Sequence, residues 1–268
     1  KAKVIAGGTD LYGALKGMIY PAPPEKLVNI KTIPGLDYIK EEGGVLKIGA
    51  LTRLTDIVES SVVQSKWASL AEAAYKVGTP QLRNMGTIGG NLCQDVRCWY
   101  YRAEHNGFLC YRKGGPLCYL LLGVSERHGA IFGGAVCFTV TPSDTAIPLT
   151  ALNATVVTTK RSIPIKDFFV VLGNVLEANE IITEIQVPQP TAGTKQVFLK
   201  WAERKALDFA EASAAIAITP ATGNVTDARI VLGAVAPVPW RATGAEDAVK
   251  GKAITAAVAE AAGAEAVK

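Results

Sequence analysis

The stretch GTIGGNLCQDVRCWYYR, residues 86–102, joins a glycine-rich turn to the start of a cysteine cluster. Gly89 and Gly90 lack a Cβ, so the backbone of this turn can approach a ligand closely. Thr87 adds a hydroxyl, and Asn91 adds a side-chain amide. Glycine turns suit phosphates whereas thiols suit metals, so this segment could form one site or two.

A second glycine-rich turn, AGGTDL, spans residues 6–11 between a strand-like and a helix-like segment. The amides of Thr9 and Asp10 would then point out of a helix N-terminus, where an anion is favoured. Either side chain could instead cap the helix, and the residues alone favour a purely structural turn. Neither glycine turn has the spacing G-x-G-x-x-G or a phosphate-loop lysine, which argues against a Rossmann or nucleoside-triphosphate cradle.

Length, charge and hydropathy exclude several classes of protein. The 268 residues suit two domains. The net charge of +4 is spread along the chain and is too weak to predict nucleic-acid binding. The apolar runs are too short to span a bilayer and no leader-like segment is present, so we expect a cytoplasmic protein without a membrane partner. The chain starts inside a strand-like segment without Met, and we expect its natural N-terminus to lie upstream.

The five cysteines fall within one stretch of the chain: Cys93, Cys98, Cys110, Cys118 and Cys137. A secreted disulfide protein would spread its cysteines, so this clustering indicates a metal site. None of the spacings is the C-x2-C of bacterial ferredoxins, and from chemistry alone zinc and an iron–sulfur cluster are equal alternatives. The odd number leaves one cysteine outside a four-ligand set.

Periodicity predicts the main elements. Residues 52–78 are expected to be helical, and four strands are expected at 180–190, 196–204, 212–220 and 228–236. The Ala-rich residues 245–262 predict a helix. We place a domain division near residue 161.

Three segments in this order, AGGTDL, VGTPQLRNMGTIGGNL and TPSDTAIPLTALNA, resemble the FAD-binding medium subunit of the molybdenum hydroxylase and xanthine dehydrogenase family. The later segments RSIPIKDFF, EIITEIQVP and KWAERKALDFAEASAAIAI look like the same family, so the resemblance covers nearly the whole chain. It implies an α+β fold. Residues 1–161 would form an FAD-binding PCMH-type (vanillyl-alcohol-oxidase-like) domain of two α/β subdomains, and 162–268 a smaller α+β flavoprotein C-terminal domain.

The resemblance implies FAD as cofactor. Asp144 matches a family position whose carboxylate accepts hydrogen bonds from ribityl or ribose hydroxyls, although alone it would be interpreted as a helix cap. Lys200 matches a position near the flavin ring, where a cation stabilises reduced flavin; the alternative is an exposed charge on a strand. The missing first strand–helix unit and the tight turn VVTTKRSIP depart from the family and leave the adenine end less defined. The residues implied to wrap the pyrophosphate are Val4, Ile5, Ala6, Gly7, Gly8, Thr9, Asp10, Leu11, Thr87, Ile88, Gly89, Gly90 and Asn91.

The cysteines lie in an insertion, at about residues 94–138, that most family members lack. The β-subunit of 4-hydroxybenzoyl-CoA reductase carries a [4Fe–4S] cluster in an insertion at this place and shares its C-x7-C element. That resemblance implies Cys98, Cys110, Cys118 and Cys137 as ligands and leaves Cys93 as a small residue beside the flavin turn. The opening stretch would then belong to two sites joined by one turn.

The sequence therefore predicts an electron-transfer flavoprotein subunit of a molybdenum-dependent oxidoreductase. It would pass electrons between the [4Fe–4S] cluster, FAD and two partner chains, a molybdopterin-binding large subunit and a [2Fe–2S] small subunit, in a dimer of heterotrimers. Ferredoxin or NAD would be the external electron partner. No catalytic residue is assigned, because no acid–base pair or nucleophile stands out. The alternatives are the FAD subunit of an NAD-dependent xanthine, aldehyde or N-heterocycle dehydrogenase with structural zinc, and a non-catalytic zinc-stapled scaffold.

Overall fold

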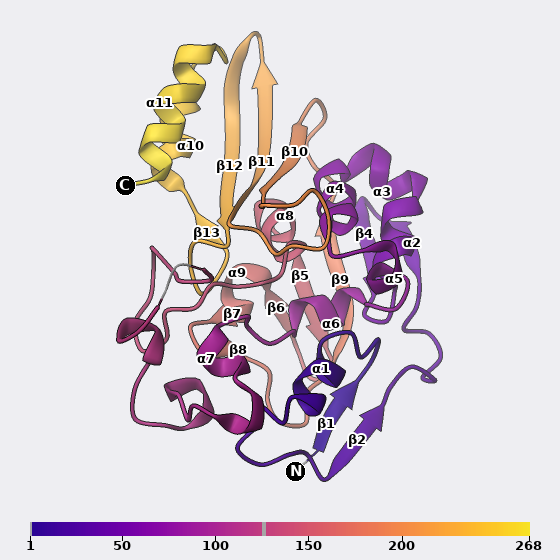
Figure 1. Ribbon diagram of the computed structural model, residues 1–268. Coiled ribbons are helices and arrows are strands. Elements are labelled where there is room, and N and C mark those ends of the chain that lie inside the picture. The colour runs from indigo at the N-terminus through magenta and orange to yellow at the C-terminus, as the bar shows by residue number, and fades with distance from the viewer. Residues whose placement is uncertain (1, 125–126) are drawn as a thin grey trace.

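The computed structural model describes residues 2–124 and 127–268 (Figure 1). Its N-terminal unit consists of β1 (Ala2–Ile5), α1 (Leu11–Lys16) and β2 (Lys26–Asn29). The two strands pair in parallel and α1 lies in the connection between them, as parallel pairing requires a crossover. Gly8 takes a φ of +73° where β1 turns into α1, which a residue with a side chain rarely adopts. The predicted strand–turn–helix at residues 6–11 is confirmed.

A five-stranded antiparallel sheet forms the centre of the molecule. Its inward-facing residues, such as Leu46, Ile48 and Ile185, are fully buried, and α2, α3 and α4 contribute to the same core. Strand β9 pairs with β4 and β5, so this sheet continues across residue 161, where we placed the domain division. The strand order is β3 (Ile39–Glu42), β4 (Val45–Gly49), β9 (Ile182–Pro188), β5 (Thr155–Thr158) and β6 (Ser162–Pro164).

The helical region predicted at residues 52–78 is three helices rather than one. Ser60 accepts a hydrogen bond from the amide of Val63 and so caps a new helix after a break. Trp67 is fully buried at the next break, and its Nε1 donates to the carbonyl of Pro188 on β9 at 3.0 Å. The helices are α2 (Leu54–Glu59), α3 (Ser61–Lys66) and α4 (Ala68–Lys76).

A second antiparallel sheet contains three of the four strands predicted in the C-terminal part. Helix α8 (Ala146–Ala151) packs against β11 and β12, while the C-terminal helices flank β12 on the side away from α2–α4 (Figure 1). The Ala-rich tail forms two helices because the chain leaves helical geometry at Lys250, where ψ is 136°. The elements are β10 (Lys195–Trp201), β11 (Ala212–Ala221), β12 (Asn224–Gly233), β13 (Trp240–Arg241), α10 (Thr243–Val249) and α11 (Ala256–Ala266).

The cysteine-bearing insertion is built mainly from short turns. It packs on α1 through a core that includes Ala14, Ile19 and Tyr101. A hairpin of β7 (Phe169–Val170) and β8 (Gly173–Asn174) follows α9 (Ile165–Phe168). The remaining elements are α5 (Pro80–Arg83), α6 (Ile88–Leu92), α7 (Trp99–Arg102) and 3-10 turns at Glu104–Asn106, Tyr111–Lys113 and Tyr119–Leu121. Within the described residues, every helix is too short or too polar to cross a membrane.

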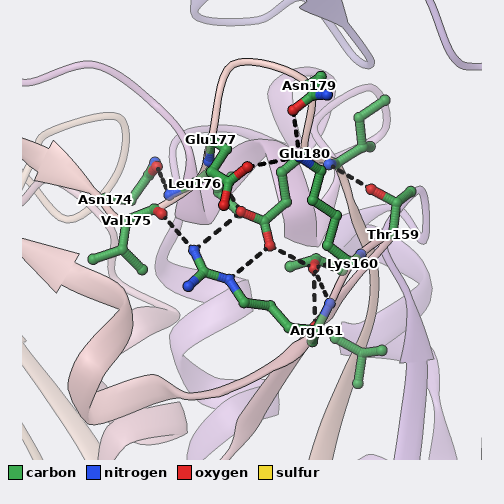
Figure 2. A network of polar contacts seen from close by, with 12 residues as sticks. Thr159, Lys160, Arg161, Asn174, Val175, Leu176, Glu177, Asn179 and Glu180 are labelled. Atoms are coloured by element: carbon green, nitrogen blue, oxygen red, sulfur yellow. Dashed lines mark hydrogen bonds and ion pairs between the residues drawn. The ribbon is translucent and has the colours of Figure 1, made fainter.

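One buried carboxylate fixes the loop that leads into β9 (Figure 2). The Glu180 side chain is fully buried and accepts hydrogen bonds from Arg161 Nε at 3.0 Å and Nη2 at 3.1 Å. It also accepts from Thr158 Oγ1 at 2.7 Å and from the amide of Glu177 at 3.0 Å. The hydrogen bonds from Arg161, Glu177 and Thr158 lower the pKa of Glu180 from 4.5 to about 2. The network joins the β5–β6 turn to residues 174–180.

Candidate functional site

The two glycine-rich turns lie in direct backbone contact. A Cβ on Gly7 would lie 1.9 Å from the carbonyl oxygen of Met85, so a side chain cannot be accommodated there without separating the turns. A Cβ on Gly86 would in turn lie 3.5 Å from Thr9 Oγ1. Residues far apart in the sequence therefore form one paired structure.

Two cavities flank the paired turns, and both are lined by Thr87 and Gly90. The central cavity has a volume of about 310 Å³ and is also lined by Thr9, Asp10, Asn91, Gln94, Arg97, Arg102, Asp144, Lys200, Leu207 and Phe209. The side cavity has a volume of about 130 Å³ and is also lined by Val4, Ala6, Ile30, Ala50, Gly89, Cys93, Leu176, Glu180 and Ile182.

The cavities bring together most of the residues that the sequence assigned to FAD. The central cavity gathers Thr9, Asp10, Thr87, Gly90, Asn91, Asp144 and Lys200, and the side cavity adds Val4, Ala6 and Gly89. Ile5 and Ile88 are buried in the protein core instead. Gly7 and Gly8 act through the backbone: Gly7 allows the contact with Met85, and Gly8 makes the turn into α1 at Leu11.

The backbone amides of Gly89 and Gly90 in the second turn were expected to be free for a ligand, but both are already hydrogen-bonded. The amide of Gly89 donates to the carbonyl of Ala50 at 3.0 Å, and that of Gly90 donates to Thr87 Oγ1 at 3.2 Å. The turn is the capped start of α6, so both amides are already bonded, one to the cap Thr87 and the other to a neighbouring segment. By contrast, the amides of Thr9 and Asp10 make no hydrogen bond to the described residues. The first turn therefore supplies the free donors.

Lys200 and Asp144 form a buried ion pair at the wall of the central cavity. Lys200 Nζ lies 2.7 Å from Asp144 Oδ2, and the two side chains are 6% and 8% exposed. Burial raises the pKa of Asp144, and the charge of Lys200 opposes this effect. Lys200 is thus not an exposed strand charge. Nor is Asp144 the helix cap, because Ser143 Oγ accepts from the amide of Ala146.

Asp10 connects the first glycine turn to the cysteine insertion. Its carboxylate accepts hydrogen bonds from Arg97, from Arg102 at 2.6 Å and from the amide of Asp95 at 2.8 Å. Burial tends to raise the pKa of Asp10, but Arg97 and Arg102 outweigh it and hold the pKa below its usual value. The carboxylate does not cap α1, which was the alternative that the sequence left open.

Arg97 was not assigned to the FAD site from the sequence. Its guanidinium stacks 4.5 Å from the ring centroid of Phe209, and both residues line the central cavity. Its Nε is buried and has no hydrogen-bond partner among the described residues. A free donor beside a lysine and the free amides of the first turn is the chemistry that suits an anionic, oxygen-rich ligand such as FAD.

Asn91 holds the two parts of the cavity wall together. Its Oδ1 accepts hydrogen bonds from Ser143 Oγ at 2.6 Å and from Thr145 Oγ1 at 2.7 Å, and the side chain is buried. These bonds fix the turn that carries Asp144 against the second glycine turn. Neither hydroxyl was identified from the sequence.

Four of the five cysteines converge on a separate small cavity. Cys98, Cys110, Cys118 and Cys137 line this cysteine cavity of about 10 Å³, whereas Cys93 lines the side cavity. Burial raises the pKa of Cys98, and the neighbouring thiols of Cys110 and Cys137 raise it further. Across residues 2–124 and 127–268, no group of three or more His, Cys, Asp or Glu side chains is arranged to hold a single metal ion.

Comparison with known proteins decides the family. The model of the FAD-binding domain in molybdopterin dehydrogenases matches residues 1–190. The chain belongs to this family. The C-terminal domain of the CO dehydrogenase flavoprotein matches residues 197–268. The predicted α+β fold and the FAD cofactor are thereby confirmed.

Individual proteins similar to this chain support its membership of this family. The FAD-binding subunit of aldehyde oxidoreductase from Escherichia coli is 34% identical over 91% of this chain and 78% of its own length. The medium chain of carbon monoxide dehydrogenase from Hydrogenophaga pseudoflava is 33% identical over 97% of this chain and 76% of its own. A solved structure of carbon monoxide dehydrogenase from that organism, lacking the Mo-pyranopterin moiety, superposes with a TM-score of 0.76 over 98% of this chain and 77% of its own, at 32% identity.

Proposed function

We propose that this chain is the electron-transfer flavoprotein subunit of a molybdenum-hydroxylase-type oxidoreductase and holds FAD at the paired glycine turns. The observation that carries the proposal is the buried Lys200–Asp144 pair beside the unpaired Nε of Arg97 in the described central cavity. The pyrophosphate would be wrapped by Val4–Leu11 and Thr87–Asn91. FAD exchanges electrons in pairs, whereas iron–sulfur centres pass them singly, so a subunit with both connects two kinds of redox partner.

We further propose that Cys98, Cys110, Cys118 and Cys137 ligate a [4Fe–4S] cluster, as in the 4-hydroxybenzoyl-CoA reductase type. Their convergence on one cavity supports a shared ligand. Four thiolates can hold a zinc ion as well as an iron–sulfur cluster. The C-x7-C spacing of Cys110 and Cys118, which resembles that of the reductase type, favours the cluster.

Binding a cluster would require the cysteine cavity to widen. A volume of about 10 Å³ is close to what one water molecule needs. The walls are α7, the 3-10 turns at Tyr111–Lys113 and Tyr119–Leu121, and the segment around Cys137. These walls are short helical turns and an irregular segment.

The same family membership supports an assembly with a molybdopterin-binding large subunit and a [2Fe–2S] small subunit, which we propose to be a dimer of heterotrimers. Substrate would react on the molybdenum subunit, and ferredoxin or NAD would exchange electrons with this one. We also propose that the FAD-binding part extends through β9, because β9 pairs with β4 and β5. The division would then fall within residues 189–194, between β9 and β10, instead of near 161.

The test is cofactor analysis of the subunit purified in its complex. We expect flavin absorbance, a broad iron–sulfur shoulder, and iron and sulfide by chemical assay. Zinc without iron would refute the cluster and favour the NAD-dependent alternative with a structural metal. Absence of flavin would refute the whole proposal.

Matched cysteine variants test the ligand set. Cys110→Ser should lose iron and sulfide while retaining FAD, because Cys110 lines the cysteine cavity. Cys93→Ser is the control for the ligand set and should retain iron and sulfide, since Cys93 lines the side cavity and not the cysteine cavity. Full iron occupancy in Cys110→Ser would show that the ligand set is wrong.

A further inference from the structure

Three buried polar side-chain atoms of the described chain have no hydrogen-bond partner: Arg97 Nε, Arg112 Nε and Thr139 Oγ1. Arg97 belongs to the central cavity, as shown above. Arg112 and Thr139 both line the cysteine cavity, together with the four cysteines. Buried polar groups in folded proteins are normally paired, so two unpaired donors at one small cavity indicate a missing acceptor.

The side chain of Arg112 is held by two hydrogen bonds that leave its Nε donor unpaired. Its Nη1 donates to the carbonyl of Leu172 at 2.9 Å, and its Nη2 donates to the carbonyl of Val171 at 2.8 Å. Both acceptors lie in the turn between β7 and β8, so the planar guanidinium is anchored from outside the insertion. This anchoring leaves Nε, which is buried, without an acceptor among the described residues.

Thr139 presents its hydroxyl from the other end of the insertion. It lies two residues after Cys137, is 1% exposed, and is fixed by a backbone bridge to Gly129. Packing alone does not explain a threonine here, because a valine has the same shape and would bury no unpaired hydroxyl. A sulfur ligand in the cysteine cavity would provide the acceptor.

We propose that Arg112 Nε and Thr139 Oγ1 donate hydrogen bonds to the sulfur atoms of the [4Fe–4S] cluster and raise its reduction potential. This inference rests on the proposed function, since it needs the cluster. A reduced cluster carries one more negative charge than an oxidised one, so donors at its sulfurs stabilise the reduced state more. Both residues would contact the cluster directly and tune its potential without ligating iron.

The test is a redox titration of the purified complex, followed by the electron paramagnetic resonance signal of the reduced cluster. Thr139→Val keeps the side-chain shape and removes the hydroxyl. We expect the equilibrium constant for reduction to fall about tenfold, a potential 59 mV more negative for a one-electron couple. Iron and sulfide contents should match the wild type, and cofactor-free protein should lose no stability, because the hydroxyl has no partner in the described chain.

Two further variants separate the causes. Arg112→Lys keeps the positive charge but removes Nε, and we expect its cluster potential to fall while the FAD content remains full. Thr141→Val is the matched control: Thr141 is also buried and lies two residues from Thr139, but it lines other cavities. Its potential should equal that of the wild type.

The outcomes distinguish this inference from the proposed function. A wild-type complex without iron would overturn both. A wild-type complex with full iron and sulfide, whose Thr139→Val and Arg112→Lys variants keep the wild-type potential, would overturn the hydrogen bonds alone and leave the cluster in place. An equal shift in Thr141→Val would also overturn the inference, since it would show a general packing effect.

Discussion

Gly7→Ala tests the contact between the two glycine turns. The new Cβ would lie 1.9 Å from the carbonyl oxygen of Met85 and 2.7 Å from its carbonyl carbon. Both atoms belong to the backbone, so no flexible side chain can move aside, and the turns must separate by about 1 Å to reach the closest tolerated contact. Overpacking of this kind costs about 1–3 kcal/mol. We expect a loss near the upper end of that range, together with loss of FAD.

The free energy of unfolding is measured by urea denaturation, and the FAD content by absorbance of the purified complex. Gly263→Ala is the control, because Gly263 is exposed in α11 and a Cβ there meets nothing within 4 Å. Replacing a helical glycine by alanine stabilises by about 0.5–1 kcal/mol, so the control should be slightly more stable than the wild type. Wild-type stability and full FAD in Gly7→Ala would refute the packing of the turns.

Two other predictions concern buried charges. Lys200→Met leaves the carboxylate of Asp144 buried without its cation, so we expect the free energy of unfolding to fall by about 3–5 kcal/mol. The double variant Lys200→Met/Asp144→Asn removes the buried charge as well and should lose less. Equal losses of the two variants in urea denaturation would contradict the ion pair. Glu180 has its pKa lowered from 4.5 to about 2, so its contribution to stability is full above pH 4.5 and is lost as pH falls from 4.5 to 2. The difference in Tm between wild type and Glu180→Gln should therefore narrow over that range, and a constant difference would contradict the Arg161–Glu180 pairing.

Short-range patterns predicted much of this molecule correctly. The turn at residues 6–11 was predictable because Gly8 lies between an apolar strand and a helix-forming segment. The strands around Ile185, Phe198 and Ile230 follow from short segments rich in apolar, strand-forming residues. The single helix predicted at residues 52–78 was wrong because helical periodicity continues across Ser60 and Trp67, while the break depends on a cap and on burial.

The site depended on contacts that no local pattern specifies. Arg97 reaches Asp10 across 87 residues, from an insertion without regular periodicity. The bonded amide of Gly89 could not be predicted, because its acceptor, the carbonyl of Ala50, comes from a segment that the sequence does not link to this turn. The sequence could not decide whether the side chain of Lys200, on an edge strand, is exposed or buried. Only its ion pair with the buried Asp144 shows that it is buried.

The position of Lys200 late in the chain has a consequence for how the subunit is made. Synthesis of a protein runs from its N-terminus to its C-terminus. The glycine turns and Asp144 are synthesised well before the cation that neutralises that carboxylate. We therefore expect the Lys200–Asp144 pair at the wall of the central cavity to form late in the synthesis of the subunit. Products of premature termination before β10 lack Lys200, and we expect them to bind FAD poorly.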